Sequence, residues 1–170
     1  NISPRLTVLS DNSVVVAWCH NYSSVRIQRI SENGTLQWGN GGIYIQDNSG
    51  DLINPIPLAV DEFNVLLQWN HQSGPSWAPD SNLYLQKYNS SGIELWDSPA
   101  IAVGPEVFPT GDYSQELLGD NIGGSFSTWT QMAGSNQSSI TQRITSSGEI
   151  VWGNGIAFSA NSSHFRTNPR

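Results

Sequence analysis

Residues 28–38 read QRISENGTLQW, and this pattern occurs three times in the chain. The second copy is QKYNSSGIELW at residues 86–96, and the third is QRITSSGEIVW at residues 142–152. In each copy a cation follows the glutamine, a glycine lies six residues after the glutamine, and a tryptophan lies four residues after the glycine. The three tryptophans are 58 and 56 residues apart, which predicts tandem repeats of about 57 residues.

Short apolar runs surround each copy, and Gly, Asn, Asp and Ser separate the runs. In the first unit the runs are residues 6–9, 14–18, 25–30 and 43–45. Runs of this length at regular spacing, without a helical period of 3.6, are typical of β-strands. The repeated glycine lies where a tight hairpin needs a residue with positive φ, which favours antiparallel pairing of the runs around it.

We therefore predict an all-β chain of three tandem four-stranded antiparallel β-meanders, each like one blade of a β-propeller. The predicted bounds are 1–50, 51–104 and 105–160, and residues 161–170 are read as the start of another repeat. One such sheet cannot bury both of its faces, so the units should stack on each other. Closed propellers have four to eight blades. We therefore expect association with further copies or neighbouring repeats, in a ring or a filament.

Two tryptophans, one glutamine and one glycine recur in every unit, and we assign them structural roles. We expect the tryptophans to pack against the neighbouring unit, and the glutamine amides to bond backbone groups between sheets. These structural repeat residues are Trp18, Trp38, Trp69, Trp96, Trp129, Trp152, Gln28, Gln86, Gln142, Gly34, Gly92 and Gly148.

Composition excludes several classes of protein. The 170 residues include seven lysines and arginines against fourteen aspartates and glutamates, and the basic residues are scattered. This argues against nucleic-acid binding, which needs clustered cations. The single cysteine, Cys19, excludes an internal disulfide and is expected to be buried at a strand end. No apolar run approaches the roughly 20 residues of a membrane-spanning helix.

The polar residues do not form a recognisable catalytic pattern, and we expect neither enzyme activity nor a cofactor or metal. His20 and His71 occupy equivalent positions, but no third metal ligand accompanies them, so both are read as surface residues near loops. His164 belongs to no such pair. The segment from Asp47 to Asp51 begins like a calcium loop but lacks its central Gly and closing Glu, so it is read as a turn between units.

Glycosylation sequons are more frequent than this composition gives by chance. All fall at predicted turns or chain ends: Asn1, Asn21, Asn33, Asn89, Asn136 and Asn161. They predict N-linked glycans and a secreted or cell-surface location. The alternative is that Asn and Ser recur because they form turns well.

The repeats resemble propeller-like units of large secreted or surface-exposed bacterial proteins. The matching elements are the glutamine–cation pair, the Gly-x-x-x-Trp spacing, and the Gly-Gly turn before Trp129, which units one and two lack. Residues 97–99 also depart from the Gly-Asn-Gly of the other two units. The hairpins are less similar to the Asp-box of sialidase-type propellers. These resemblances imply a β-propeller fold and no particular activity.

Our leading hypothesis is a non-catalytic, self-assembling structural protein of a surface fibre, filament or adhesin scaffold. The first alternative is a carbohydrate-binding propeller lectin, in which Trp77, the one tryptophan outside the repeat, stacks on a sugar. The second alternative is a fragment of a propeller glycosidase.

Overall fold

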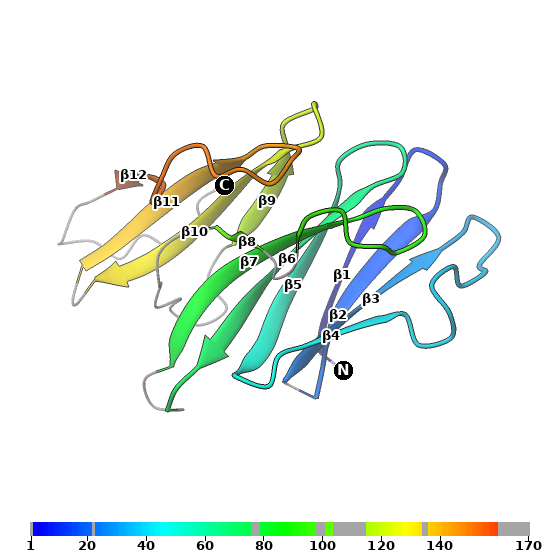
Figure 1. The fold of residues 1–170 in the computed structure, drawn as a ribbon, viewed down its shortest axis with the longest axis horizontal. Helices are drawn as coiled ribbons and strands as arrows, with labels where there is room; N and C mark the ends of the chain where they lie inside the picture. Colours follow the sequence, from blue (N-terminus) through cyan, green and yellow to red (C-terminus); the bar gives the residue numbers. More distant parts are fainter. Residues whose placement is uncertain are drawn as a thin grey trace.

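A computed structural model describes residues 2–21, 23–75, 79–97, 101–103, 115–133 and 136–159. In these residues the chain is all-β and forms three antiparallel sheets (Figure 1). The prediction of an all-β antiparallel chain is therefore confirmed. The described ranges contain no helix that is long and apolar enough to cross a bilayer.

Each sheet is built from strands that are consecutive in the chain. The orders are β1-β2-β3-β4, β5-β6-β7-β8 and β9-β10-β11-β12, and we call these sheets with their connecting turns units 1, 2 and 3. The strands are β1 Ile2–Val8, β2 Val14–His20, β3 Ser24–Ile30, β4 Ile43–Gln46, β5 Asp51–Ala59, β6 Val65–Ser73, β7 Asp80–Tyr88, β8 Ile101–Ala102, β9 Glu116–Gly119, β10 Ser125–Ala133, β11 Asn136–Ile144 and β12 Ile156–Ser159. The fourth strand of unit 2 has only two residues, so the predicted four-stranded unit is matched only in part there.

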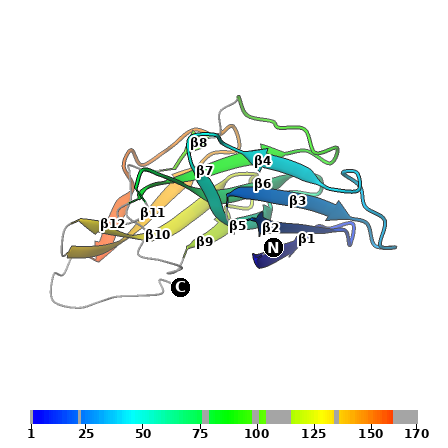
Figure 2. The ribbon, with the colours of Figure 1, turned by 90° about the horizontal axis from the view of Figure 1, so that it is seen from below.

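The three sheets are arranged as a fan. Figure 2 shows the first strands β1, β5 and β9 along one side and the fourth strands β4, β8 and β12 on the outer arc. Contacts between units are correspondingly made by β1 with β5 and by β5 with β9. Pro4 in β1 and Pro55 in β5 both lie where the register shifts. A proline is tolerated there because these are edge strands and the shift removes the need for its missing N–H.

The hydrophobic core lies between successive sheets. One face of each sheet packs on the preceding unit, and we call it the leading face; the other packs on the following unit, and we call it the trailing face. Val15, Ala17 and Ile27 on the trailing face of unit 1 meet Leu67 and Trp69 on the leading face of unit 2. The second core joins the trailing face of unit 2 to the leading face of unit 3, through Leu66, Leu83, Leu85, Trp129, Ile140 and Ile144.

The burial of the second strands follows from this stacking. From Val65 to His71 every residue of β6 is buried, because unit 2 has a neighbour on both faces. In β2 buried and half-buried residues alternate, because only its trailing face is covered. The apolar run of Val65, Leu66 and Leu67 in β6 fits burial on both faces of the sheet.

Candidate assembly interface

The repeated glutamine lies at a gap in the pairing of the third strand. In unit 3, β11 pairs with β12 only from Ser139 to Thr141, and the next bridge joins Ile144 to Ile150. Gln142 stands between these two segments. In units 1 and 2 the corresponding gaps follow Ile27 and Leu85 and contain Gln28 and Gln86. The chain that should complete the ladder leaves the sheet at this point, so the glutamine amide supplies the missing hydrogen bonds.

The contacts of Gln142 show how the amide replaces the missing strand hydrogen bonds. Its side-chain oxygen accepts hydrogen bonds from the backbone N–H of Trp152 and of Arg143, both at 2.9 Å. Its side-chain nitrogen donates to the carbonyl of Gly153 at 2.8 Å. The side chain is fully buried, so each polar atom needs such a partner.

The other two glutamines bind their own units in the same way. The backbone N–H of Trp38 donates to the side-chain oxygen of Gln28 at 3.0 Å, and the backbone N–H of Trp96 donates to that of Gln86 at 3.3 Å. Gln28 also donates to the carbonyl of Gly39 at 2.6 Å. The amides therefore bond backbone within one unit, whereas the sequence led us to expect bonds between sheets. The reason is that each amide lies beside a gap in its own sheet.

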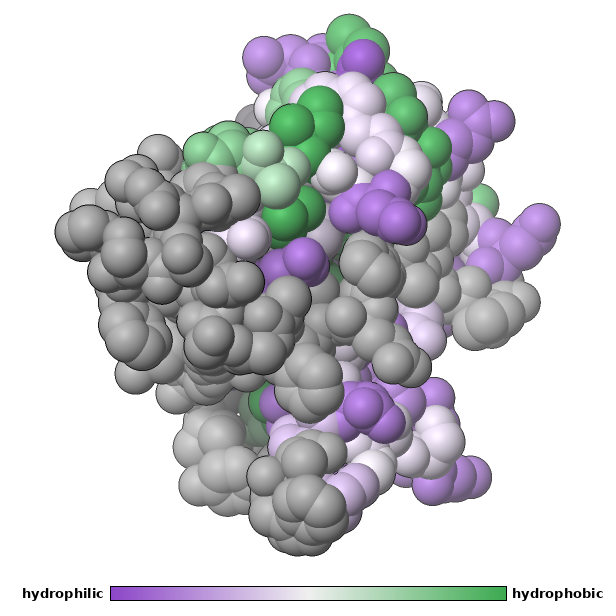
Figure 3. All heavy atoms as spheres, turned by 90° about the vertical axis from the view of Figure 1, so that its left-hand side faces the viewer, coloured by the Kyte–Doolittle hydropathy of each residue, from purple (hydrophilic) through white to green (hydrophobic). Residues whose placement is uncertain are grey.

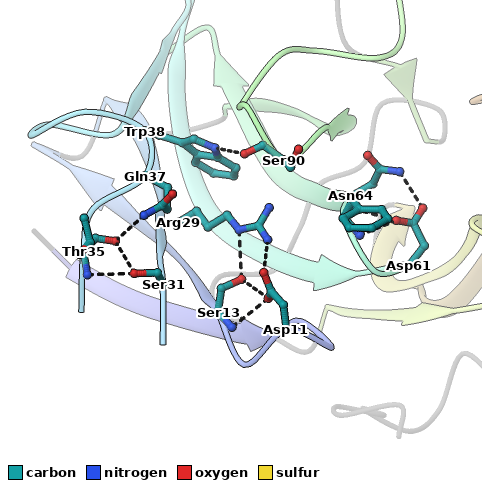
Figure 4. Close-up of polar contacts among 11 residues, drawn as sticks. Asp11, Ser13, Arg29, Ser31, Thr35, Gln37, Trp38, Asp61, Asn64 and Ser90 are labelled. Carbon is teal, nitrogen blue, oxygen red and sulfur yellow. Dashed lines mark hydrogen bonds and ion pairs between the residues drawn. The ribbon is translucent and has the colours of Figure 1, made fainter. Parts of the chain in front are cut away.

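The tryptophan held by this amide makes the contact between units. The indole N–H of Trp38 donates to the carbonyl of Ser90, in the hairpin of unit 2, at 2.9 Å (Figure 4). The indole N–H of Trp96 donates to the equivalent carbonyl of Ser146, in the hairpin of unit 3, at 3.1 Å. Both rings are buried. The glutamine, the tryptophan and the next hairpin thus form one chain of contacts that occurs at both interfaces.

The hairpins are shaped by the repeated glycines. Gly34, Gly92 and Gly148 have φ of +84°, +79° and +92°, a region in which other residues are strained. This conformation turns the chain between the third strand and the tryptophan. The carbonyl that receives the neighbouring indole lies two residues before the glycine in units 2 and 3.

An ion pair that sequence reasoning missed closes each unit at its first turn. The Arg29 guanidinium lies 2.6 Å from the Asp11 carboxylate, and Figure 4 shows both beside Ser13. The hydroxyl and the backbone N–H of Ser13 donate to Asp11, and with Arg29 they lower the pKa of Asp11 to about 2. The signal was present in the sequence, because every cation after the repeated glutamine has an Asp-led turn upstream.

Units 2 and 3 carry the same ion pair with different geometry. Lys87 lies 3.9 Å from Asp61 and also donates to the carbonyl of Gly123 in unit 3, at 3.1 Å. Arg143 lies 3.5 Å from Asp120. Burial of Asp120 raises its pKa, but hydrogen bonds from the N–H groups of Ile122 and Gly124, with the charge of Arg143, hold that pKa below its ordinary value.

The sequon asparagines lie at different kinds of position. Asn33 and Asn89 lie in the equivalent hairpins of units 1 and 2, and Asn33 is exposed. Asn21 is exposed and has φ of +55° in the turn between β2 and β3. Asn136 is the first residue of β11 and pairs with Ala133, so it lies on a strand and not in the loop that we expected. Asn1, Asn161 and residues 161–170 lie outside the described residues, as do Trp77 and His164.

The two equivalent histidines have different surroundings. His71 is buried in β6, not in a surface loop as expected, because the turn after β4 folds over it. Its Nε2 lies 3.2 Å from the Ser49 hydroxyl and 3.7 Å from the Asp47 carboxylate. Hydrogen bonds from the hydroxyl and the backbone N–H of Ser49 lower the pKa of Asp47. His20 ends β2 and packs edge-on against Tyr44. In the described part of the chain, no three His, Cys, Asp or Glu residues gather as metal ligands would.

A groove of about 420 Å³ lies on the leading face of unit 1. Its walls come from β2 and β3, where Trp18 and Arg26 face each other across the strand pair, and from the hairpin. The Arg26 guanidinium also lies 4.7 Å from the centre of the Tyr44 ring. The lining residues are Val16, Trp18, His20, Arg26, Gln28, Ile30, Leu36, Asn40 and Gly41.

Comparisons with family models, with curated proteins and with solved structures find no match for this chain.

Proposed function

We propose that this chain is a non-catalytic structural module of an extracellular, N-glycosylated scaffold, in which blade-like units stack as in a β-propeller or a filament. The observation that supports this proposal most is the repeated contact between units. The indole of Trp38 meets the hairpin of unit 2, and the indole of Trp96 meets the hairpin of unit 3. The residues that the repeat retains are thus used to join one unit to the next.

Exposed polar turns support the extracellular part of the proposal. The side-chain oxygen of Asn33 accepts hydrogen bonds from Ser31 and Thr35, while no bond from its side-chain nitrogen, the atom that would carry a sugar, occurs among the described contacts. In Asn89 the oxygen likewise accepts bonds from Ser91 and Ile93. Asn33 is exposed and Asn89 is half-buried in the single chain, and a glycan on either side chain must project from its hairpin into solvent, away from the contacts between units.

The test is made on the organism that encodes the chain. An antibody raised against the purified protein should label intact, unpermeabilised cells or their secreted matrix. Peptides from the extracted protein should carry sugar at Asn33 and Asn89. Labelling that requires permeabilisation, together with unmodified peptides, would refute the extracellular assignment.

A second candidate, a carbohydrate-binding lectin, is favoured by the groove of unit 1. Trp18 supplies a ring for stacking on a sugar, and Arg26 and His20 supply polar groups beside it. A glycan array probed with the wild-type protein and with Trp18→Ala separates the two candidates. Sugar binding that is lost in Trp18→Ala favours the lectin, and no binding to any sugar removes it. Hydrolysis of a glycoside panel would in turn favour the glycosidase fragment.

A further inference from the structure

The leading face of unit 1 and the trailing face of unit 3 each resemble one side of the interface that adjacent units form within the chain. The leading face of unit 2 bears Leu67 and Trp69, which unit 1 covers. The equivalent residues of unit 1, Val16 and Trp18, are half-buried and line the open groove. The groove therefore lies where the structural pattern provides a preceding unit.

The hairpin of unit 1 likewise receives no tryptophan from another described unit. The residue equivalent to the acceptors Ser90 and Ser146 is Glu32, which is exposed. Its carbonyl accepts no hydrogen bond from the described residues. A hollow of about 480 Å³ adjoins it, lined by Asp11, Ser13, Ser31, Glu32 and Asn33.

The opposite end, the trailing face of unit 3, has the complementary half. Trp152 is half-buried where its equivalents Trp38 and Trp96 are buried. Its ring packs at a tilt against that of Phe126 in its own unit, with the ring centroids 5.8 Å apart. Its indole N–H has no acceptor among the described residues.

The cation that follows the repeated glutamine is also more exposed in unit 3 than in the other units. The Arg143 side chain is 35% exposed, whereas those of its equivalents Arg29 and Lys87 are each 8% exposed. Figure 3 faces this end of the molecule and shows apolar side chains among polar ones on its surface. Among the described residues of unit 3, the exposed large apolar side chains are Leu118, Ile122, Val151, Ile156 and Phe158.

We propose that a second copy of this chain packs the trailing face of its unit 3 onto the leading face of unit 1, head to tail. In this contact the Trp152 indole of one copy donates to the Glu32 carbonyl of the other, as Trp38 donates to Ser90 and Trp96 to Ser146. A second copy is the occupant because the two faces continue an interface that the chain already makes twice. The proposal rests on the scaffold function above and specifies its partner.

For an assembly made only of these 170 residues, the number of copies follows from the three described units. A contact between two different faces closes into a ring or continues as a filament. Two copies bring together six units, which lies within the four to eight blades of closed propellers. We therefore expect a dimer in which both interfaces are the same head-to-tail contact.

The test measures the mass of the intact chain by analytical ultracentrifugation over a range of concentrations. The wild type should sediment as a species of twice 18.6 kDa. Trp152→Ala and Val16→Asp should each raise the dissociation constant about 30-fold or more, as loss of a buried interface anchor does. Ile93→Ala, which removes an exposed apolar side chain from the hairpin of the inner unit 2, is the matched control and should leave the mass unchanged.

Mixing the two variants tests the head-to-tail direction. Trp152→Ala retains an intact leading face, and Val16→Asp retains an intact trailing face, so the mixture should recover a heterodimer through one interface. Near-ultraviolet circular dichroism must show that each variant is folded. A longer oligomer that both substitutions dissociate also supports the contact. A wild type that stays monomeric overturns it, while surface labelling and glycan mapping would still test the scaffold function separately.

Discussion

The substitution Gln142→Leu tests whether the repeated glutamine holds each unit together. Leucine has a similar volume but cannot accept the hydrogen bonds from the backbone N–H groups of Trp152 and Arg143. A buried donor left unpaired costs about 1–3 kcal/mol. The carbonyl of Gly153, which also loses its partner, lies in an exposed residue and can bind water. Two unpaired donors therefore predict a loss of about 3 kcal/mol in the free energy of unfolding.

The assay is thermal unfolding followed by circular dichroism, with urea unfolding as a second measurement. A loss of about 3 kcal/mol corresponds to a fall in Tm of roughly 6–12 °C for a domain of this size. The control is Gln37→Leu, an exposed glutamine that makes one hydrogen bond to Thr35, for which we expect less than about 0.5 kcal/mol. If Gln142→Leu lowers Tm no more than this control, the glutamine does not replace missing strand pairing.

Three further predictions concern other parts of the repeat. Trp96→Phe removes the indole bond to Ser146 between units 2 and 3 and should cost about 1–2 kcal/mol in urea unfolding. Asp11 has a folded pKa of about 2, below the unfolded value of 3.8, so it stabilises the fold above about pH 4 and this contribution is lost as the pH falls towards 2; Asp11→Asn should flatten that pH dependence. Gly34→Ala places alanine at a φ of +84° and should cost about 1–2 kcal/mol. Gly119→Ala is the control, because Gly119 has no positive φ and an added Cβ there also meets nothing within 4 Å, so it should lower Tm by less.

Local patterns in the sequence were sufficient for the strands and hairpins. The short apolar runs, the spacing of the glutamine, glycine and tryptophan, and the turn residues all act over a few neighbours. The glycine position predicts a positive φ because no other residue adopts it at low cost. Cys19 was expected to be buried, and it is. The positions of Trp77 and of residues 161–170 stay predictions.

The partners of polar side chains were harder to predict. The amide of Gln142 bonds its own unit because β12 stops short of it, and strand length is set by packing as well as by local sequence. His71 is buried because the turn before β5 covers it, a contact between residues 22 positions apart. The pairing of Arg29 with Asp11 joins two motifs that are separate in the chain but adjacent across β2 and β3.

A tandem of β-sheets with a tight hairpin and two tryptophans in each unit can be predicted from the amino-acid sequence, because strand propensity and turn conformation are local properties. Which face of each sheet is covered depends on the packing of the units, since burial depends on what lies across the interface. Val16 and Leu67 occupy equivalent positions, yet one lines an open groove and the other is fully buried. Leu67 is buried because unit 1 packs on it, whereas none of the described residues packs on Val16 in the same way.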